Sequence, residues 1–200
     1  MRQSVGRTIS PWLASVAPPR RLPLAGDVHT GVAVIGAGIA GLSIAYTLAR
    51  EGRPVVVIDA GPIGGGQSGR TTAHLSNAMD DLYQTIASVH GEDGARLAAE
   101  SHGAAIDRIE GTARDEHIAC DFERLDGYLF AATADDIEIV RRERDAAHAA
   151  GLVDVALVPR APLAHFDTGM ALRFPRQAQF HVLKYLAGLA EAIERRGGRS

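Results

Sequence analysis

The clearest pattern of hydrophobic and polar positions lies early in the chain. Val32–Ile35 is a short, uninterrupted apolar run, which is typical of a parallel strand buried on both faces. Apolar residues then recur at helical spacing up to Arg50, and Gly52 is placed to end that helix in a left-handed conformation. A second apolar run, Val55–Ile58, leads directly into Asp59. The pattern therefore predicts a strand, a helix and a second strand, joined as a right-handed βαβ unit.

After this unit, apolar residues follow no regular spacing over residues 61–81, and regular spacing begins again at residue 81. Residues 61–81 are rich in glycine, serine and threonine and predict a functional loop, with a surface loop carrying helix-capping threonines as the alternative. Helical spacing covers three further segments: 81–117 with a break at His90 and Gly91, 135–151, and 182–198. Strands are predicted at 152–159 and 171–174, ended by Pro159 and Pro175, and as a pair within 120–132 joined near Asp126 and Gly127.

Composition and charge are those of a globular protein. Of the 200 residues, 46% are hydrophobic, which is enough for a buried core. Lysine and arginine (21) nearly balance aspartate and glutamate (24), so neither a nucleic acid nor an anionic membrane is expected as a partner. No stretch approaches the about 20 apolar residues that span a bilayer. Residues 1–30 lack a signal-peptide core and are interpreted as a cytoplasmic leader or docking segment.

The number of cysteines limits which disulfides and metal sites the chain can form. Cys120 is the only cysteine, so an internal disulfide and a cysteine-rich metal site are excluded, and no metal site is predicted. A buried thiol is its expected role, and a single cysteine fits a reducing compartment.

The first chemical signal is the glycine pattern between the first strand and its helix. Gly36 permits a tight turn, Gly38 leaves room for phosphates, and Gly41 allows close packing of helix and strands. The N–H groups that open the helix, together with its dipole, bind a pyrophosphate. Asp59, twenty-three residues after Gly36, is placed to accept hydrogen bonds from both ribose hydroxyls and to repel the extra phosphate of NADP. The pattern predicts a dinucleotide site and leaves FAD and NAD open.

The loop that follows favours FAD. An NAD domain is expected to lead quickly from the second strand into another crossover, whereas this chain spends about fifteen residues on glycines and hydroxyls. Ser68, Arg70, Thr71 and Thr72 carry groups able to bind a pyrophosphate, a ribityl chain or the flavin ring. For Arg70 a surface charge is an equal alternative.

Residues 32–75, VAVIGAGIAGLSIAYTLAREGRPVVVIDAGPIGGGQSGRTTAHL, resemble the D-amino-acid-oxidase-like FAD-dependent oxidoreductases, which include glycine and sarcosine oxidases. Three further stretches are similar to the subset of that family that carries a Rieske iron–sulfur domain after the flavoprotein part: SPWLASVAPPRRLPLAGDV, GRTTAHL and ALRFPRQAQFHVLKYLAGLAEAIERRGG. The resemblance implies an α/β fold, with a Rossmann-like FAD/NAD(P)-binding domain of glutathione-reductase type and part of an α+β substrate domain.

The same resemblance implies the organisation of the chain. We expect a leader at 1–30, an FAD-binding βαβ unit and loop at 31–80, inserted substrate-domain elements at 81–178, and a helix returning to the FAD-binding domain at 179–200. A helix in an α/β fold normally leads into another strand, so the chain is expected to be truncated. The resemblance implies that a C-terminal half supplies a second flavin-contacting region and much of the substrate pocket, so the chain is expected to be inactive by itself.

The implied function is oxidation of an amine or amino-acid-type substrate by hydride transfer to FAD, with an electron-transfer partner or a further C-terminal domain. A 2Fe-2S cluster is expected only if a Rieske domain lies outside this chain, because one cysteine cannot supply its ligands. The alternatives are an NAD-dependent dehydrogenase and a non-catalytic flavin- or nucleotide-binding module. No catalytic residue is assigned. The expected cofactor-binding residues are Gly36, Ala37, Gly38, Ile39, Gly41, Asp59, Ala60, Ser68, Arg70, Thr71 and Thr72.

Overall fold

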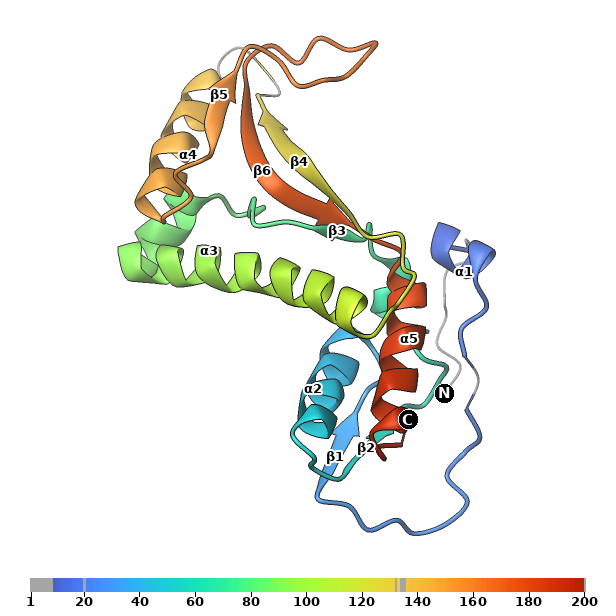
Figure 1. Cartoon of the computed structure of the whole chain (residues 1–200). Coiled ribbons are helices and arrows are strands. Elements are labelled where there is room, and N and C mark those ends of the chain that lie inside the picture. Colours follow the sequence, from blue (N-terminus) through green and yellow to red (C-terminus); the bar gives the residue numbers. More distant parts are fainter. Residues whose placement is uncertain (1–8, 20, 132, 134–135, 200) are drawn as a thin grey trace. The chain divides into compact units, whose positions relative to one another are not determined.

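The computed structural model of the chain describes residues 9–19, 21–131, 133 and 136–199. The chain divides into two compact units. The first unit comprises Met1–Ala73, Thr112–Phe122 and Phe180–Ser200, and the second comprises His74–Gly111 and Glu123–Gln179. In Figure 1 most of the first unit is drawn in blue and red, and most of the second unit is drawn in green to orange.

The first unit is built on the predicted βαβ element. Strands β1 (Val32–Ile35) and β2 (Val55–Ile58) pair in parallel along their whole length, and α2 (Ile39–Arg50) connects them. Gly52 adopts a φ of 73° directly after the helix, which is the left-handed conformation that glycine tolerates. The bounds of both strands and of the helix were predicted correctly from the sequence.

One prediction about β1 is wrong. The continuous apolar run suggested a strand buried on both faces, but Ala33 is exposed and Ile35 is 78% exposed. Successive strand side chains point to opposite faces. Helix α2 packs on the face of Val34, where a Cβ at Gly41 would lie 3.3 Å from the Val34 side chain. Ala33 and Ile35 therefore point to the face that α2 does not cover.

Helix α5 (Val182–Arg195) returns to the first unit and packs beside α2. It is shorter than the predicted segment 182–198, because Gly197 turns the chain with a φ of 83°. After this turn the N–H of Arg199 donates to the carbonyl of Val55 (3.1 Å), and the N–H of Val57 donates to the carbonyl of Arg199 (2.8 Å). Arg199 thus forms a parallel bridge with Val56.

A nearly buried carboxylate ties these helices together. Glu116, whose side chain is 6% exposed, accepts a hydrogen bond from the hydroxyl of Tyr46 on α2 (2.6 Å) and pairs with Arg195 and Arg196 at the end of α5. Burial by itself would raise the pKa of Glu116, but the hydrogen bonds from Tyr46, Arg196 and Arg195 outweigh it, and the pKa is lowered.

The second unit is an antiparallel sheet with helices on it. Strand β6 (Ala171–Gln179) pairs with three partners: β3 (His74–Leu75), β4 (Glu123–Phe130) and β5 (Ala156–Val158). Helix α3 (Tyr83–Asp115) is interrupted at Gly91, where the break was predicted, and α4 (Ile137–Ala149) follows β4. The core of this unit is formed by side chains of the sheet and of both helices, among them Tyr83, Val140, Ala147, Leu172 and Phe174.

Two strand predictions fail at one irregularity of this sheet. The pairing of β4 with β6 shifts between Leu125 and Gly127, so that Asp126 faces two residues, Pro175 and Arg176. This is a β-bulge, and a bulge is one of the places where a sheet accepts proline. The described part of segment 120–132 therefore contains one strand, β4, rather than two, and β6 continues through Pro175 instead of ending there.

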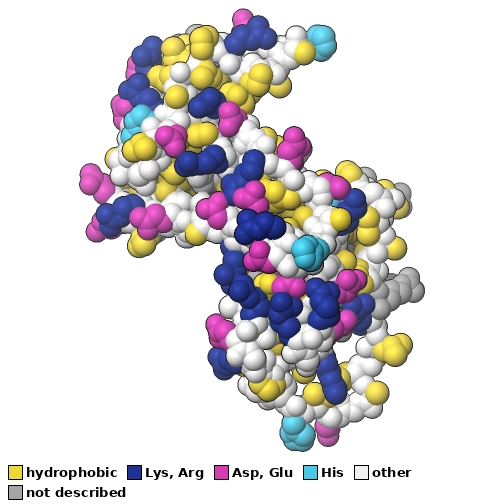
Figure 2. Space-filling view, in the orientation of Figure 1, with side chains coloured by type: hydrophobic (Ala, Val, Ile, Leu, Met, Phe, Trp, Pro, Cys, Tyr) yellow, Lys and Arg dark blue, Asp and Glu magenta, His cyan; other side chains and the backbone are white. Residues whose placement is uncertain are grey.

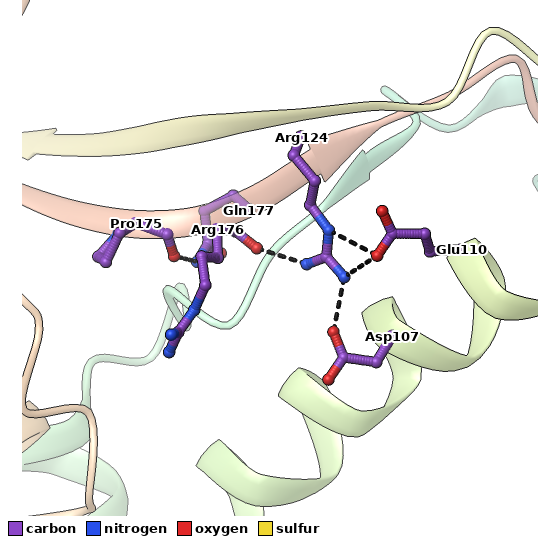
Figure 3. A network of polar contacts seen from close by, with 6 residues as sticks. All are labelled: Asp107, Glu110, Arg124, Pro175, Arg176 and Gln177. Atoms are coloured by element: carbon purple, nitrogen blue, oxygen red, sulfur yellow. Dashed lines mark hydrogen bonds and ion pairs between the residues drawn. The ribbon is translucent and has the colours of Figure 1, made fainter.

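Arg124 holds the bulge in place (Figure 3). One terminal nitrogen of its guanidinium donates to the carbonyl oxygen of Arg176 (2.7 Å). The other donates to the carboxylates of Asp107 and Glu110 on α3 (2.6 Å each). The bulge is thus linked to the helix by charge-assisted hydrogen bonds, which are stronger than neutral ones.

The bulge yields a stability prediction. Arg176 adopts a φ of 59°, a left-handed conformation that costs a residue with a Cβ about 1–2 kcal/mol. Among the residues that the structure describes, its side chain pairs only with Asp154 (3.3 Å), and this exposed ion pair contributes little. Arg176→Gly is therefore expected to raise the free energy of unfolding by up to about 1 kcal/mol in urea titrations. Gln179→Gly, in the same strand without a positive φ, should lower it by at least about 0.5 kcal/mol, and equal losses in both variants would contradict the prediction.

Candidate dinucleotide-binding site

The glycine turn between β1 and α2 has the geometry of a phosphate-binding turn. Gly36 adopts a φ of 107°, and its N–H donates to the carbonyl of Ile58 (2.8 Å), which joins the ends of the two strands. Gly38 is the N-cap residue of α2. A Cβ at Gly41 would overlap the carbonyl oxygen of Gly36, so only glycine allows the helix to start this close to the strand.

Asp59 lies at the mouth of this turn. One carboxylate oxygen accepts the N–H of Ala37 (2.7 Å), and the other accepts the N–H of Gly61 (2.8 Å). The two bonds fix the orientation of the carboxylate. Because an ionised carboxylate accepts about four hydrogen bonds, the exposed side chain of Asp59 keeps capacity for two ribose hydroxyls.

Ser68 brings a hydroxyl to the N-terminus of α2. It belongs to the short 3-10 helix η1 (Gln67–Arg70), and its oxygen accepts the N–H of Ile39 (3.0 Å). The same oxygen lies 3.0 Å from where a Cβ of Gly38 would be, so the glycine makes room for it. The N–H groups of Ala37 and Ile39 are therefore engaged by Asp59 and Ser68, and a phosphate would meet the hydroxyl of Ser68 and the first turn of α2.

A cavity of about 660 Å³ opens beside Asp59. This volume lies in the usual range for ligand pockets, about 300–1,000 Å³. The residues of the first unit that line it come from the turn, from β2 and the segment after it, and from the leader: Ala37, 56–63, Arg199, Pro19 and 21–25. Ala60, which was predicted to bind the cofactor, is among them.

Three predicted residues lie elsewhere. Arg70, Thr71 and Thr72 follow at the far end of η1 and do not line this cavity. Thr71 is the C-cap residue of η1, and its hydroxyl accepts the N–H of Ala73 (3.2 Å) in a local turn, so the alternative of a surface loop with helix-capping threonines stays open. Roles of these three residues toward the pyrophosphate and the flavin stay predictions.

The sequence did not identify the leader and Ile63 as parts of the site. Pro19 and residues 21–25 carry no periodic pattern and lie more than thirty residues before Asp59. Ile63 stands in the glycine-rich loop, where its isolated apolar side chain was a usable signal, and it is 4% exposed. The loop also makes a tertiary contact that its composition did not indicate, because a Cβ at Gly64 would lie 2.6 Å from the side chain of Leu183 and 3.0 Å from that of Leu186 on α5.

Further properties of the chain concern its thiol, metal ions, membranes and charged partners. Cys120 is 1% exposed, as predicted for a buried thiol, and burial raises its pKa. Within the described ranges, no cluster of three or more His, Cys, Asp or Glu residues is arranged to hold a metal ion, and no helix is both long and apolar enough to cross a membrane. Positive and negative side chains lie next to one another over the face shown in Figure 2.

Comparison with known proteins identifies the family. The FAD dependent oxidoreductase family matches residues 31–200. The chain belongs to this family. The match starts just before β1 and covers the glycine turn, Asp59 and the whole second unit, which confirms the resemblance noted in the sequence.

Curated relatives are similar over most of this chain. The Rieske 2Fe-2S iron–sulfur protein YhfW of Bacillus subtilis is 33% identical over 188 residues, covering 94% of this chain and 36% of that protein. Gamma-glutamylputrescine oxidoreductase of Escherichia coli is 31% identical over 179 residues, covering 86% of this chain and 41% of that protein. The chain thus spans less than half the length of these relatives.

Solved structures confirm the predicted fold class. Glycine oxidase from Geobacillus kaustophilus superposes with a TM-score of 0.69 at 20% identity, covering 86% of this chain and 46% of that one. L-amino acid deaminase from Proteus vulgaris superposes with a TM-score of 0.70 at 21% identity, covering 92% and 42%. At such identities the likeness establishes the fold alone.

Proposed function

We propose that this chain binds FAD at the glycine turn and forms the cofactor-binding part of an oxidoreductase. The observation that carries the proposal is the carboxylate of Asp59, held 2.7 Å from the N–H of Ala37 beside an open cavity. Membership of the FAD-dependent family selects FAD over NAD.

In this proposal each part of the site has a binding task. Asp59 accepts hydrogen bonds from the ribose of the adenosine, and the first turn of α2 with the hydroxyl of Ser68 stabilises the pyrophosphate. Arg70, Thr71 and Thr72 lie toward the flavin end. When bound, FAD supplies the acceptor for a hydride, while the protein fixes its orientation.

We further propose that the whole protein oxidises a C–N bond of an amine or amino acid. Support comes from the names of its relatives and structural neighbours, which include a gamma-glutamylputrescine oxidoreductase, a glycine oxidase and an L-amino acid deaminase. The Rieske relative supports an electron-transfer partner or a further domain. Cys120 alone cannot hold a 2Fe-2S cluster, so any such cluster lies outside this chain. We also propose that the protein is located in the cytoplasm.

Asp59→Ala tests the site directly. The purified chain is expected to show the visible absorbance of bound flavin, and titration with FAD should give its dissociation constant. Loss of the charge-assisted hydrogen bonds to the ribose should weaken binding by about ten- to a hundredfold. Glu51→Ala, which removes an exposed acid just after α2, should leave the affinity unchanged.

Three other results would favour a dehydrogenase, a different flavin site or a non-catalytic module. A colourless chain that binds NADH would favour a dehydrogenase. Equal FAD affinities for the parent and Asp59→Ala would show that the flavin binds elsewhere. A full-length protein whose flavin is not reduced by any amine or amino acid would be a non-catalytic binding module.

A further inference from the structure

The leader contacts the loop that carries Ser68. Its helix α1 (Pro11–Ser15) is preceded by Ser10, whose hydroxyl donates to the carbonyl of Gly69 (2.5 Å). The indole N–H of Trp12 donates to the carbonyl of Thr71 (2.8 Å). Two leader side chains therefore bind two backbone carbonyls within three residues of Ser68, on the segment that places its hydroxyl at the N-terminus of α2.

The other side of α1 is anchored to α5 through His181. The hydroxyl of Ser15 lies 2.9 Å from Nε2 of this histidine, and the ring of Trp12 packs edge-on against it at 5.1 Å between centroids. Nδ1 of His181 accepts the N–H of Lys184 (3.3 Å), so in the neutral ring Nε2 carries the hydrogen and donates to Ser15. Helix α1 is thus fixed between η1 and the start of α5.

The leader then runs to the cavity beside Asp59. The guanidinium of Arg21 makes two hydrogen bonds with the carboxylate of Glu194 on α5 (2.8 and 3.1 Å). Directly after this anchor, residues 22–25 line the cavity. Leu22 and Leu24 are 94% and 54% exposed and line the same cavity as Asp59, so two aliphatic residues stand open to solvent in a cavity that also holds a carboxylate. An aliphatic surface next to a ribose-binding acid suits the flat face of a nucleotide base.

From these contacts we infer that the leader is an integral part of the dinucleotide site. Helix α1 holds the loop that presents Ser68, and residues 21–25 form the outer wall against which the adenine base packs. The inference rests on the proposed binding of FAD. Trp12 acts as a positioning residue, because it touches the loop and not the cofactor. A loop held in place before binding avoids the entropy cost of ordering it when FAD arrives.

Trp12→Phe tests the loop contact in the full chain. Phenylalanine keeps a ring against His181 but removes the donor to Thr71, and FAD is expected to bind about three- to tenfold more weakly. Trypsin should also cut faster after Arg70, measured by the masses of the fragments, while cleavage after Arg160, an exposed residue of the second unit, serves as the internal reference. Ile9→Ala, a substitution of a 74% exposed leader residue, is the matched control and should change neither quantity.

The double variant Leu22→Ser, Leu24→Ser tests the wall. Its affinities for FAD and for ADP, which shares the adenosine and diphosphate, should both fall about three- to tenfold. If the parent chain binds FAD and the Trp12 and leucine variants bind it equally well, the inference is overturned and the proposed function stands. A parent chain that binds neither FAD nor ADP overturns both, whatever the trypsin cleavage shows.

Discussion

Gly41→Ala is expected to abolish FAD binding and to destabilise the first unit by more than about 4 kcal/mol. The added Cβ would overlap the carbonyl oxygen of Gly36 and press on the side chain of Val34 at 3.3 Å. Val34 belongs to β1, and Gly36 follows β1 directly and is hydrogen-bonded to Ile58, so both contacts are with backbone that is fixed by the parallel pairing with β2. The helix must therefore move away from the strand, and its N-terminal N–H groups move with it.

The matched control is Gly103→Ala in α3. A Cβ there meets no atom within 4 Å, and alanine is a better helix former than glycine, so this variant should be neutral or more stable by up to about 1 kcal/mol. Thermal unfolding and FAD titration of both variants provide the comparison. Retention of FAD affinity in Gly41→Ala at normal stability would show that the phosphates do not use this turn.

The sequence predicted the glycine turn well because its determinants are local. An apolar strand, a helix with a glycine stop and a second strand each follow from the residues they contain. Gly36 and Gly41 restrict the backbone through their own conformation or an immediate contact. The position of Asp59 follows from the parallel register, in which Ile35 faces Ile58. Sequence spacing therefore fixed where this carboxylate lies.

The wrong predictions about strands and burial, and the missed leader contacts, depend on residues that lie far apart in the sequence. The bulge of β4 and β6 joins Asp126 to Pro175 and Arg176, about fifty residues later, and each segment read by itself indicates a turn or a strand end. The exposure of Ile35 depends on which elements cover the sheet, which the strand's own sequence does not encode. The leader contacts likewise join residues that are 59 positions apart, as in Trp12 and Thr71.

The second large effect is expected at Glu143, in the second unit. This side chain is fully buried on α4, and its two carboxylate oxygens accept the N–H groups of Tyr83 (2.7 Å) and Gln84 (3.1 Å) at the start of α3. Glu143→Ala leaves both donors without their acceptor and opens a cavity, so a loss of about 3–5 kcal/mol is expected in urea or thermal unfolding. Glu143→Gln keeps one acceptor and should lose about 1–3 kcal/mol.

Measuring the free energy of unfolding at several pH values distinguishes the effect of the charge of Glu143 from the effect of its packing. Burial raises the pKa of Glu143 against the opposing effect of the N–H bonds from Tyr83 and Gln84. The folded state therefore binds the proton more tightly than the unfolded state, and the stabilisation from this group is lost as the pH rises through the raised pKa. Glutamine does not titrate. The free energy of unfolding of the parent should therefore exceed that of Glu143→Gln by more near pH 4.5, the ordinary pKa of glutamate, than at neutral pH. Glu138→Ala, which removes an acid that is 74% exposed on the same helix, should cost less than about 0.5 kcal/mol. A difference between parent and Glu143→Gln that grows with pH would contradict the raised pKa.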